Sequence, residues 1–219
     1  MDNKTLKTVA QQLRKPEGEY ALQVAEKMNE GNALINRYTI AFLDIKPGEH
    51  ILEIGMGNGF FVPEILGIAP DVQYTGCDFS EAMIEEASKR NAAFIQSGQA
   101  KFHLSEAAKM PLKNDSVDKI FTVNTLYFWE DPEAVFAEFR RVMKPQGQLA
   151  IAVRPKSMMA KYPFVRVGGF QLFSKDELID LVTQNGFTVR EVLEKEEPAQ
   201  VVSGERIEVS SLIVKVSNN

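Results

Sequence analysis

An acidic residue and three glycines lie close together in the stretch ILEIGMGNGF, at Glu53, Gly55, Gly57 and Gly59. Glycines allow a sharp turn and a close approach of the backbone to a ligand, and a helix that follows them presents free N–H groups. A second acid, Asp78, lies nineteen residues after Gly59, about the interval at which a carboxylate accepts hydrogen bonds from ribose hydroxyls. The pattern predicts a nucleoside site, although a glycine-rich turn can also simply join a strand to a helix.

The spacing of the glycines separates two kinds of nucleoside ligand. A dinucleotide fingerprint reads G-x-G-x-x-G, but its third glycine position is occupied here by Phe60. A dinucleotide also brings an anionic pyrophosphate to a helix N-terminus, where the Glu53 carboxylate would repel it. A ligand with ammonium and sulfonium groups is favoured by the same carboxylate. A nicotinamide-dependent oxidoreductase is therefore the weaker alternative.

A parallel sheet is the element that would bring these residues together. From residue 50 onward, β-rich runs alternate with amphipathic helical segments, which is typical of a doubly wound, Rossmann-like α/β fold. The predicted strands span residues 50–54, 72–78, 101–104, 119–124, 147–153, 188–193 and 208–216. The last two leave no room for a crossover helix between them, so the seven-stranded, mostly parallel sheet should end in an antiparallel hairpin.

Helix starts are also readable. Ser80 and Asp131 are predicted N-caps, and Ser174 with Glu177 forms a capping box. Residues 1–45 show helical patterning that is broken at Lys15-Pro16 and again near Gly31. We expect two or three accessory helices there, packed outside the sheet, and one ligand-binding domain over residues 46–219.

Composition limits the classes of partner. The 219 residues carry 25 basic and 30 acidic side chains, a net charge of −5, which gives no general reason to expect a nucleic acid or an anionic membrane. One cysteine, Cys77, and two histidines make a poor zinc inventory, so no metal is expected. No stretch has the length of a signal peptide core or a membrane span. We expect a soluble, cytoplasmic protein, and the oligomeric state is left open.

The order and separation of these motifs resemble class I S-adenosylmethionine-dependent methyltransferases of the small-molecule type, such as the quinone-biosynthesis C-methyltransferases. Residues 45–155 carry the resemblance closely and the rest of the chain more loosely. It implies S-adenosylmethionine as the cofactor, S-adenosylhomocysteine as the product, and residues 1–45 as a helical lid. The residues that it assigns to the cofactor are Glu53, Gly55, Met56, Gly57, Gly59, Asp78, Phe79, Met83, Glu106, Ala107 and Asn124.

The resemblance also implies individual roles. Glu53 would act on the methionine end of the cofactor, Asp78 on the ribose, and Phe79 on the adenine. The third motif usually reads Gly-Asp-Ala, and here it is Ser105-Glu106-Ala107. Glu106 would then meet the adenine amino group, over a longer arm than the usual aspartate has.

The acceptor side is less defined. Methyl transfer needs approach in line and exclusion of water, so a catalytic base is optional and no catalytic residue is assigned beyond the candidate Tyr127. His50 and His103 are interpreted as structural. Enzymes that methylate exocyclic amino groups typically carry two prolines after the fourth strand, and those are missing.

Residues 154–175 contain five basic side chains and no acid. One hypothesis is an anionic acceptor bound by Arg154, Tyr162, Arg166 and Tyr127; the other is a solvated surface. The sequence thus predicts methyl transfer to a small molecule by in-line displacement, with no nucleic-acid or membrane partner. An RNA or protein methyltransferase, and a non-catalytic protein that binds S-adenosylmethionine, remain as alternatives.

Overall fold

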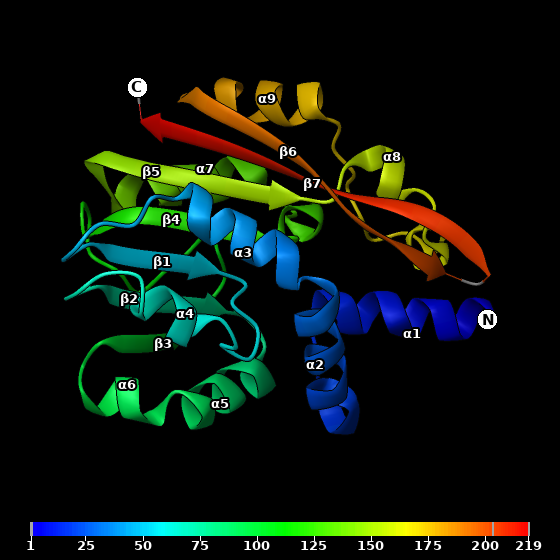
Figure 1. Cartoon of the computed structure of the whole chain (residues 1–219), viewed down its shortest axis with the longest axis horizontal. Helices are drawn as coiled ribbons and strands as arrows, with labels where there is room; N and C mark the ends of the chain where they lie inside the picture. The colour runs from blue at the N-terminus through cyan, green and yellow to red at the C-terminus, as the bar shows by residue number, and fades with distance from the viewer. Residues whose placement is uncertain (1, 203, 219) are drawn as a thin grey trace.

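The computed structural model describes residues 2–202 and 204–218, which build a seven-stranded sheet in the order β3-β2-β1-β4-β5-β7-β6 (Figure 1). Strands β1 to β5 run parallel, and β7 is antiparallel to both of its neighbours. The predicted α/β class with an antiparallel end is therefore confirmed. The strands are β1 (His50–Ile54), β2 (Gln73–Asp78), β3 (Ala100–Leu104), β4 (Val117–Val123), β5 (Met143–Val153), β6 (Phe187–Val202) and β7 (Glu205–Asn218).

Helices cover both faces of the sheet, and successive residues of a strand serve opposite faces. In β1, Ile51 packs into the core beneath α3 and α4, whereas Leu52 packs into the core beneath α7 and α9. The helices are α1 (Asn3–Arg14), α2 (Ala21–Gly31), α3 (Ala33–Phe42), α4 (Val62–Leu66), α5 (Glu81–Arg90), α6 (Ala92–Gln96), α7 (Pro132–Val142), α8 (Lys156–Met159) and α9 (Lys175–Gln184), with short 3-10 helices η1 (Gly18–Tyr20), η2 (Leu126–Phe128) and η3 (Pro163–Val167).

The predicted helix caps are present. The Ser80 hydroxyl accepts a hydrogen bond from the Met83 N–H, and the Asp131 carboxylate accepts one from the Ala134 N–H. Ser174 and Glu177 form the reciprocal capping box. Within the described residues, no helix has both the length and the apolar content needed to cross a membrane.

The N-terminal helices break where the sequence predicted, after Arg14 and after Gly31. Their packing differs from the prediction in one respect. Helix α3 contacts β4, β5 and β7, and Ile35 and Leu43 are fully buried against the sheet, so this segment belongs to the layered core. Of the three N-terminal α-helices, α1 and α2 lie beyond the sheet, next to the carboxyl ends of the parallel strands (Figure 1).

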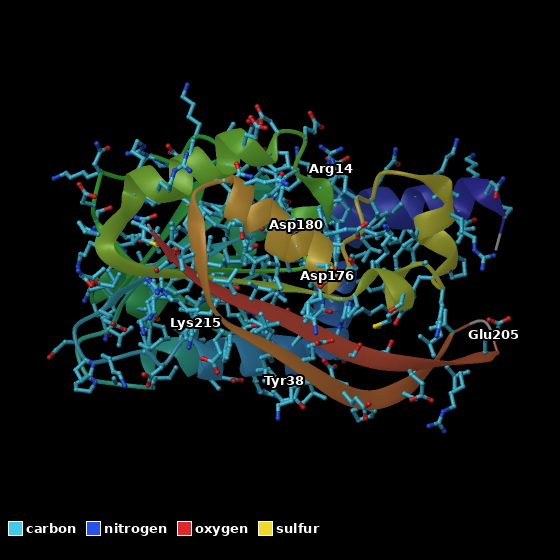
Figure 2. All side chains as sticks on the ribbon, turned by 90° about the horizontal axis from the view of Figure 1, so that it is seen from above. Arg14, Tyr38, Asp176, Asp180, Glu205 and Lys215 are labelled. Carbon is cyan, nitrogen blue, oxygen red and sulfur yellow. The ribbon has the colours of Figure 1, made fainter. Side chains whose placement is uncertain are left out.

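The C-terminal hairpin is much longer than predicted. Strands β6 and β7 pair as far as Val202 and Glu205, whereas β7 pairs with β5 only over residues 212–217. Most of the stretch between the last two predicted strands therefore belongs to a two-stranded ribbon that passes the end of the sheet, with Glu205 near its tip (Figure 2). Two buried side chains of the ribbon, Ile207 and Val209, pack against Met158. The polar composition of this stretch gave no indication of that packing.

Candidate functional site

A cavity of about 410 Å³ opens at the carboxyl ends of the parallel strands. It lies where the strand order turns from β1 to β4, the topological switch point at which open α/β sheets bind ligands. The volume falls within the range of small-molecule sites. Ten of the eleven residues predicted for the cofactor line it, namely Glu53, Gly55, Met56, Gly57, Asp78, Phe79, Met83, Glu106, Ala107 and Asn124.

The glycines of the loop after β1 serve different purposes. At Gly55, φ is +71° and a Cβ would lie 2.2 Å from the Thr125 Cγ2 atom, so a side chain has no room. At Gly57, φ is +56° and nothing stands within 4 Å of a Cβ, which leaves this stretch of backbone open. Gly59, the eleventh predicted residue, does not line the cavity; its carbonyl accepts a hydrogen bond from the Asn91 side chain, which fixes the loop against α5.

The Asp78 carboxylate holds the loop against the end of β2. Its Oδ2 accepts a hydrogen bond from the Gly57 N–H at 3.0 Å and its Oδ1 accepts one from the Ser80 N–H at 2.9 Å. The side chain is buried, and burial raises the pKa of Asp78 to about 6 against the lowering effect of these N–H donors. Asp78 therefore organises the loop while it faces the cavity.

Glu53 is the second buried carboxylate. Its Oε2 accepts a hydrogen bond from the Tyr74 hydroxyl at 2.7 Å. Burial raises the pKa of Glu53 to about 7, and the Tyr74 hydrogen bond opposes that rise while Asp78 adds to it. A buried carboxylate that faces a cavity without a cationic partner favours a cationic ligand.

One feature of the loop carried no sequence signal. The Asn58 side chain is buried at the cavity, and its Oδ1 has no hydrogen-bond donor among the described residues. An unpaired buried acceptor is costly unless a ligand or water satisfies it. Asn58 sits at a variable position of the motif, between Gly57 and Gly59, so only the structure identifies it.

The exit of β4 contributes a hydrogen-bond network. Asn124, with φ of +58°, donates from Nδ2 to the Asn32 Oδ1 at 3.0 Å and accepts at Oδ1 from the Tyr127 hydroxyl at 3.0 Å. Tyr127 is buried, burial raises its pKa, and its side chain is not among those that line the cavity. The next two aromatic residues, Phe128 and Trp129, form that part of the wall instead.

The remaining substrate candidates also lie away from the cavity. The Arg154 side chain is buried in an ion pair with Glu197, and the Tyr162 hydroxyl donates to the Gln200 side chain. Arg166 is exposed on η3 and does not line the cavity. The absence of acids within residues 154–175 did not mean that the basic side chains there are unpaired, because their acidic partners come from other segments. Lys156 pairs with Glu177 of α9, and Lys175 pairs with Glu194 of β6.

The N-terminal segment, which the resemblance predicts to be a lid, reaches the cavity through residues that were not among the individual site predictions. Leu13, Arg14 and Pro16 line it, and the Pro16 carbonyl accepts a hydrogen bond from the Ser80 hydroxyl at 2.5 Å. Arg14 forms an ion pair with Glu130 at 2.5 Å. Three asparagines also line the cavity: Asn29 near the end of α2, Asn32 in the turn that follows, and Asn36 in the first half of α3. No local pattern marks these residues, since their role depends on where α1 and α2 pack.

The cavity is strongly acidic. Its lining includes five carboxylates, Glu53, Asp78, Glu106, Glu130 and Asp131, and among the lining residues the one lysine or arginine is Arg14. Within the residues described, no group of three or more His, Cys, Asp or Glu side chains is placed to hold a metal ion. Fold, loop and charge together define a nucleoside-binding α/β protein whose site suits a positively charged ligand, as S-adenosylmethionine is.

Comparison with known proteins agrees with that class. Residues 52–151 match a family described as a methyltransferase domain. An O-methyltransferase of Pyrenophora dematioidea is 29% identical over 164 residues, which cover 72% of this chain and 61% of that protein. The uncharacterised methyltransferase YdaC of Bacillus subtilis is 29% identical over 143 residues, which cover 65% of this chain and 77% of YdaC. The present chain thus spans less than two thirds of the Pyrenophora protein.

Solved structures share the fold. The crystal structure of a SAM-dependent methyltransferase from Aquifex aeolicus superimposes with a TM-score of 0.68 at 23% identity, over 88% of this chain and 95% of the other. The chain belongs to the class I S-adenosylmethionine-dependent methyltransferases. The family and the cofactor predicted from the sequence are confirmed.

Proposed function

We propose that the protein transfers the methyl group of S-adenosylmethionine to a small-molecule acceptor by in-line displacement. The observation that carries the proposal is the pair of buried carboxylates, Glu53 and Asp78, which face one cavity at the switch point of the sheet without a cationic side chain bound to either. The relatives named methyltransferases support the same reaction class.

The residues present fit the cofactor. Glu53 would receive its ammonium group, and the open backbone at Gly57 would lie along its amino-acid end. Asp78 would accept from the ribose hydroxyls, and Glu106 with Ala107 would meet the adenine. When bound, S-adenosylmethionine supplies a methyl group on a positively charged sulfur, which is a good leaving group.

An acceptor pocket lies on the other side of the cavity. Phe128, Trp129 and Met28 offer apolar walls, and the asparagines of α2, α3 and the turn between them offer neutral hydrogen-bonding groups. At the exit of β4, the lining side chains are Asn124 and Thr125, neither of which removes a proton near neutral pH. We therefore assign to the chain the placement of the acceptor and the exclusion of water, and we assign no residue as a base.

The N-terminal helices would close the site. Residues 13–16 lie over the cavity, and the Arg14–Glu130 ion pair and the Ser80–Pro16 hydrogen bond hold this segment to the sheet domain. A segment that enters the wall through a few contacts is suited to open for ligand exchange and to close during transfer. Residues 1–31 are the part of the chain that we propose as this lid.

The test is calorimetric titration with S-adenosylmethionine, S-adenosylhomocysteine and NADH, of the native protein, Asp78→Ala and a control. Asp180→Ala is the matched control, because Asp180 is exposed on α9 and outside the cavity (Figure 2). We expect micromolar binding of the first two ligands, lost in Asp78→Ala and kept in Asp180→Ala. Transfer of labelled methyl groups to a panel of phenols, carboxylic acids, amines and RNA then identifies the acceptor class.

Binding of NADH alone would refute the proposal. Tight binding of S-adenosylmethionine without transfer to any acceptor would favour the non-catalytic binding protein, and labelling of RNA would refute the small-molecule acceptor.

A further inference from the structure

Tyr74 is a buried residue that the cofactor site uses indirectly. Its side chain is 1% exposed, and its hydroxyl donates the hydrogen bond to Glu53. In the pairing of β1 with β2, Glu53 lies opposite Gly76 and Ile51 lies opposite Tyr74. Tyr74 and Gly76 are two residues apart, so they share a face of the sheet, and the tyrosine reaches Glu53 diagonally.

Gly76 makes this reach possible. A Cβ at position 76 would lie 3.0 Å from the Tyr74 hydroxyl oxygen, 2.8 Å from the Met56 Cγ and 3.1 Å from the Phe102 ring. Any other residue would displace the hydroxyl or its neighbours. Gly76 has an ordinary strand conformation, since its φ is not positive, so the reason for glycine here is space and not backbone freedom.

The contact leaves one oxygen of Glu53 available. Oε2 accepts from Tyr74, while Oε1 has no hydrogen-bond partner among the described residues, and the side chain lines the cavity. Burial and the Glu53 charge raise the pKa of Tyr74 well above its ordinary value, so the phenol remains a proton donor. Tyr74 thus fixes the orientation of the carboxylate and leaves Oε1 for a ligand.

Among the described residues, no basic side chain compensates the charge of Glu53. Tyr74 and Asp78 of β2 are the ionisable groups that act on it, and Cys77 acts in turn on Tyr74. The other neighbouring elements bring neutral side chains to the cavity: Asn36 from α3, Met56 and Asn58 from the loop, and Val123 from β4. The other charged side chains that line the cavity are those of Arg14, Glu106, Glu130 and Asp131.

We propose that Tyr74 is the positioning residue of the cofactor site: its hydrogen bond turns the Glu53 carboxylate toward the ligand and favours its ionised form, and binding of a ligand ammonium group releases to solvent any proton that Glu53 still carries. This inference rests on the proposed function, because it takes the amino-acid end of the cofactor as the partner of Glu53. Tyr74 acts through Glu53 and does not touch the reacting atoms.

The test compares the native protein with Tyr74→Phe, which removes only the hydroxyl, in titrations with S-adenosylhomocysteine at pH 6, 7 and 8. Loss of a hydrogen bond to a carboxylate raises the pKa of Glu53, so the affinity defect should be about tenfold at pH 6 and shrink to about twofold at pH 8, where Glu53 ionises without help. Asp78 titrates in both proteins and cancels in the ratio. In the native protein, the affinity for S-adenosylhomocysteine should rise as the pH increases through about 7, where Glu53 ionises.

Three controls separate this effect from a change of packing. Tyr38→Phe alters a half-buried tyrosine of α3 outside the cavity (Figure 2) and should leave every titration unchanged. The ligand 5′-methylthioadenosine lacks the amino-acid end, so its affinity should not respond to Tyr74→Phe. In Glu53→Gln, which cannot ionise, adding Tyr74→Phe should produce no further pH-dependent loss.

A Tyr74→Phe defect that is equal at all three pH values, or that extends to 5′-methylthioadenosine, would overturn the inference and leave the proposed function standing. Failure of the native protein to bind S-adenosylhomocysteine would overturn the proposed function itself.

Discussion

Two buried carboxylates lie in opposite kinds of surroundings. At the ligand cavity, Glu53 is 5% exposed, has a neutral phenol as its donor, and has a raised pKa because burial is not offset by a cation. At the joint between the sheet and the long hairpin, the Glu197 side chain is 4% exposed and is paired with Arg154. The protein therefore buries a carboxylate in two ways, with and without its counter-charge.

The difference distinguishes a buried carboxylate that stabilises the fold from one that is available to bind a ligand. The Arg154 guanidinium also donates to the Gly31 carbonyl at 3.2 Å and to the Ser211 hydroxyl at 3.1 Å, so it joins the end of α2 to the hairpin. At this joint, the charges of Arg154 and Glu197 compensate each other within the chain. At Glu53, no basic side chain among the described residues compensates the charge, which is the condition for a ligand to do so.

Removing one half of the compensated pair should have the largest effect. In Arg154→Ala, Glu197 is left buried and unpaired, and the free energy of unfolding should fall by about 3–5 kcal/mol, measured by urea denaturation. The double variant Arg154→Ala/Glu197→Gln should recover part of that loss. A stable Arg154→Ala protein with a raised Michaelis constant for an anionic acceptor would reverse the assignment and restore Arg154 to the substrate site.

Within the cavity, two glycines should respond differently to alanine. Gly55→Ala forces a Cβ against Thr125 in a left-handed conformation, so we expect a loss of about 3 kcal/mol in the free energy of unfolding. Gly57→Ala meets only the backbone penalty, about 1 kcal/mol. If thermal denaturation showed the same loss of stability for both variants, the loop would have rearranged to accommodate the Cβ at residue 55.

Removing the uncompensated charge should stabilise the ligand-free protein. Glu53 ionises near its ordinary pKa of 4.5 in the unfolded chain but only at about 7 when folded, so its contribution to stability is lost as pH rises through that window. Glu53→Gln should therefore raise the free energy of unfolding by about 3 kcal/mol at pH 8 and leave it unchanged at pH 4. If Glu53→Gln instead lowered the free energy of unfolding at pH 8, the interpretation of Glu53 as an uncompensated buried charge would be wrong.

The smallest effect is expected at the lid. The Arg14–Glu130 pair has side-chain exposures of 43% and 81%, so Arg14→Ala should lower the free energy of unfolding by about 0.5 kcal/mol. Lys175→Ala, which breaks a similarly exposed pair with Glu194, is the matched control. If Arg14→Ala weakens binding of S-adenosylhomocysteine and Lys175→Ala does not, residues 13–16 act in ligand binding more than in folding.

The parallel half of the molecule was predictable because its signals are local. Strand β1 has the predicted bounds, and the predicted cofactor residues follow β1, β2, β3 and β4 in the order that brings them to one edge of the sheet. The hairpin half was not. Residues 194–202 and 205–207 look like parts of a solvated loop, and they form strand only because β6 and β7 pair with each other while α8 covers Ile207 and Val209.

The alternation of strands and helices, the glycine loop, and the acids Glu53 and Asp78 near the ends of strands could be read from the sequence, because each depends on residues close together in the chain. Only the tertiary structure decided which charges are compensated. Arg154 and Glu197 are 43 residues apart, and Arg14 and Glu130 are 116 apart, so no local pattern reveals either pair. The same limit applies to Tyr74, since its contact with Glu53 exists only through the register of β1 and β2 and the space left at Gly76.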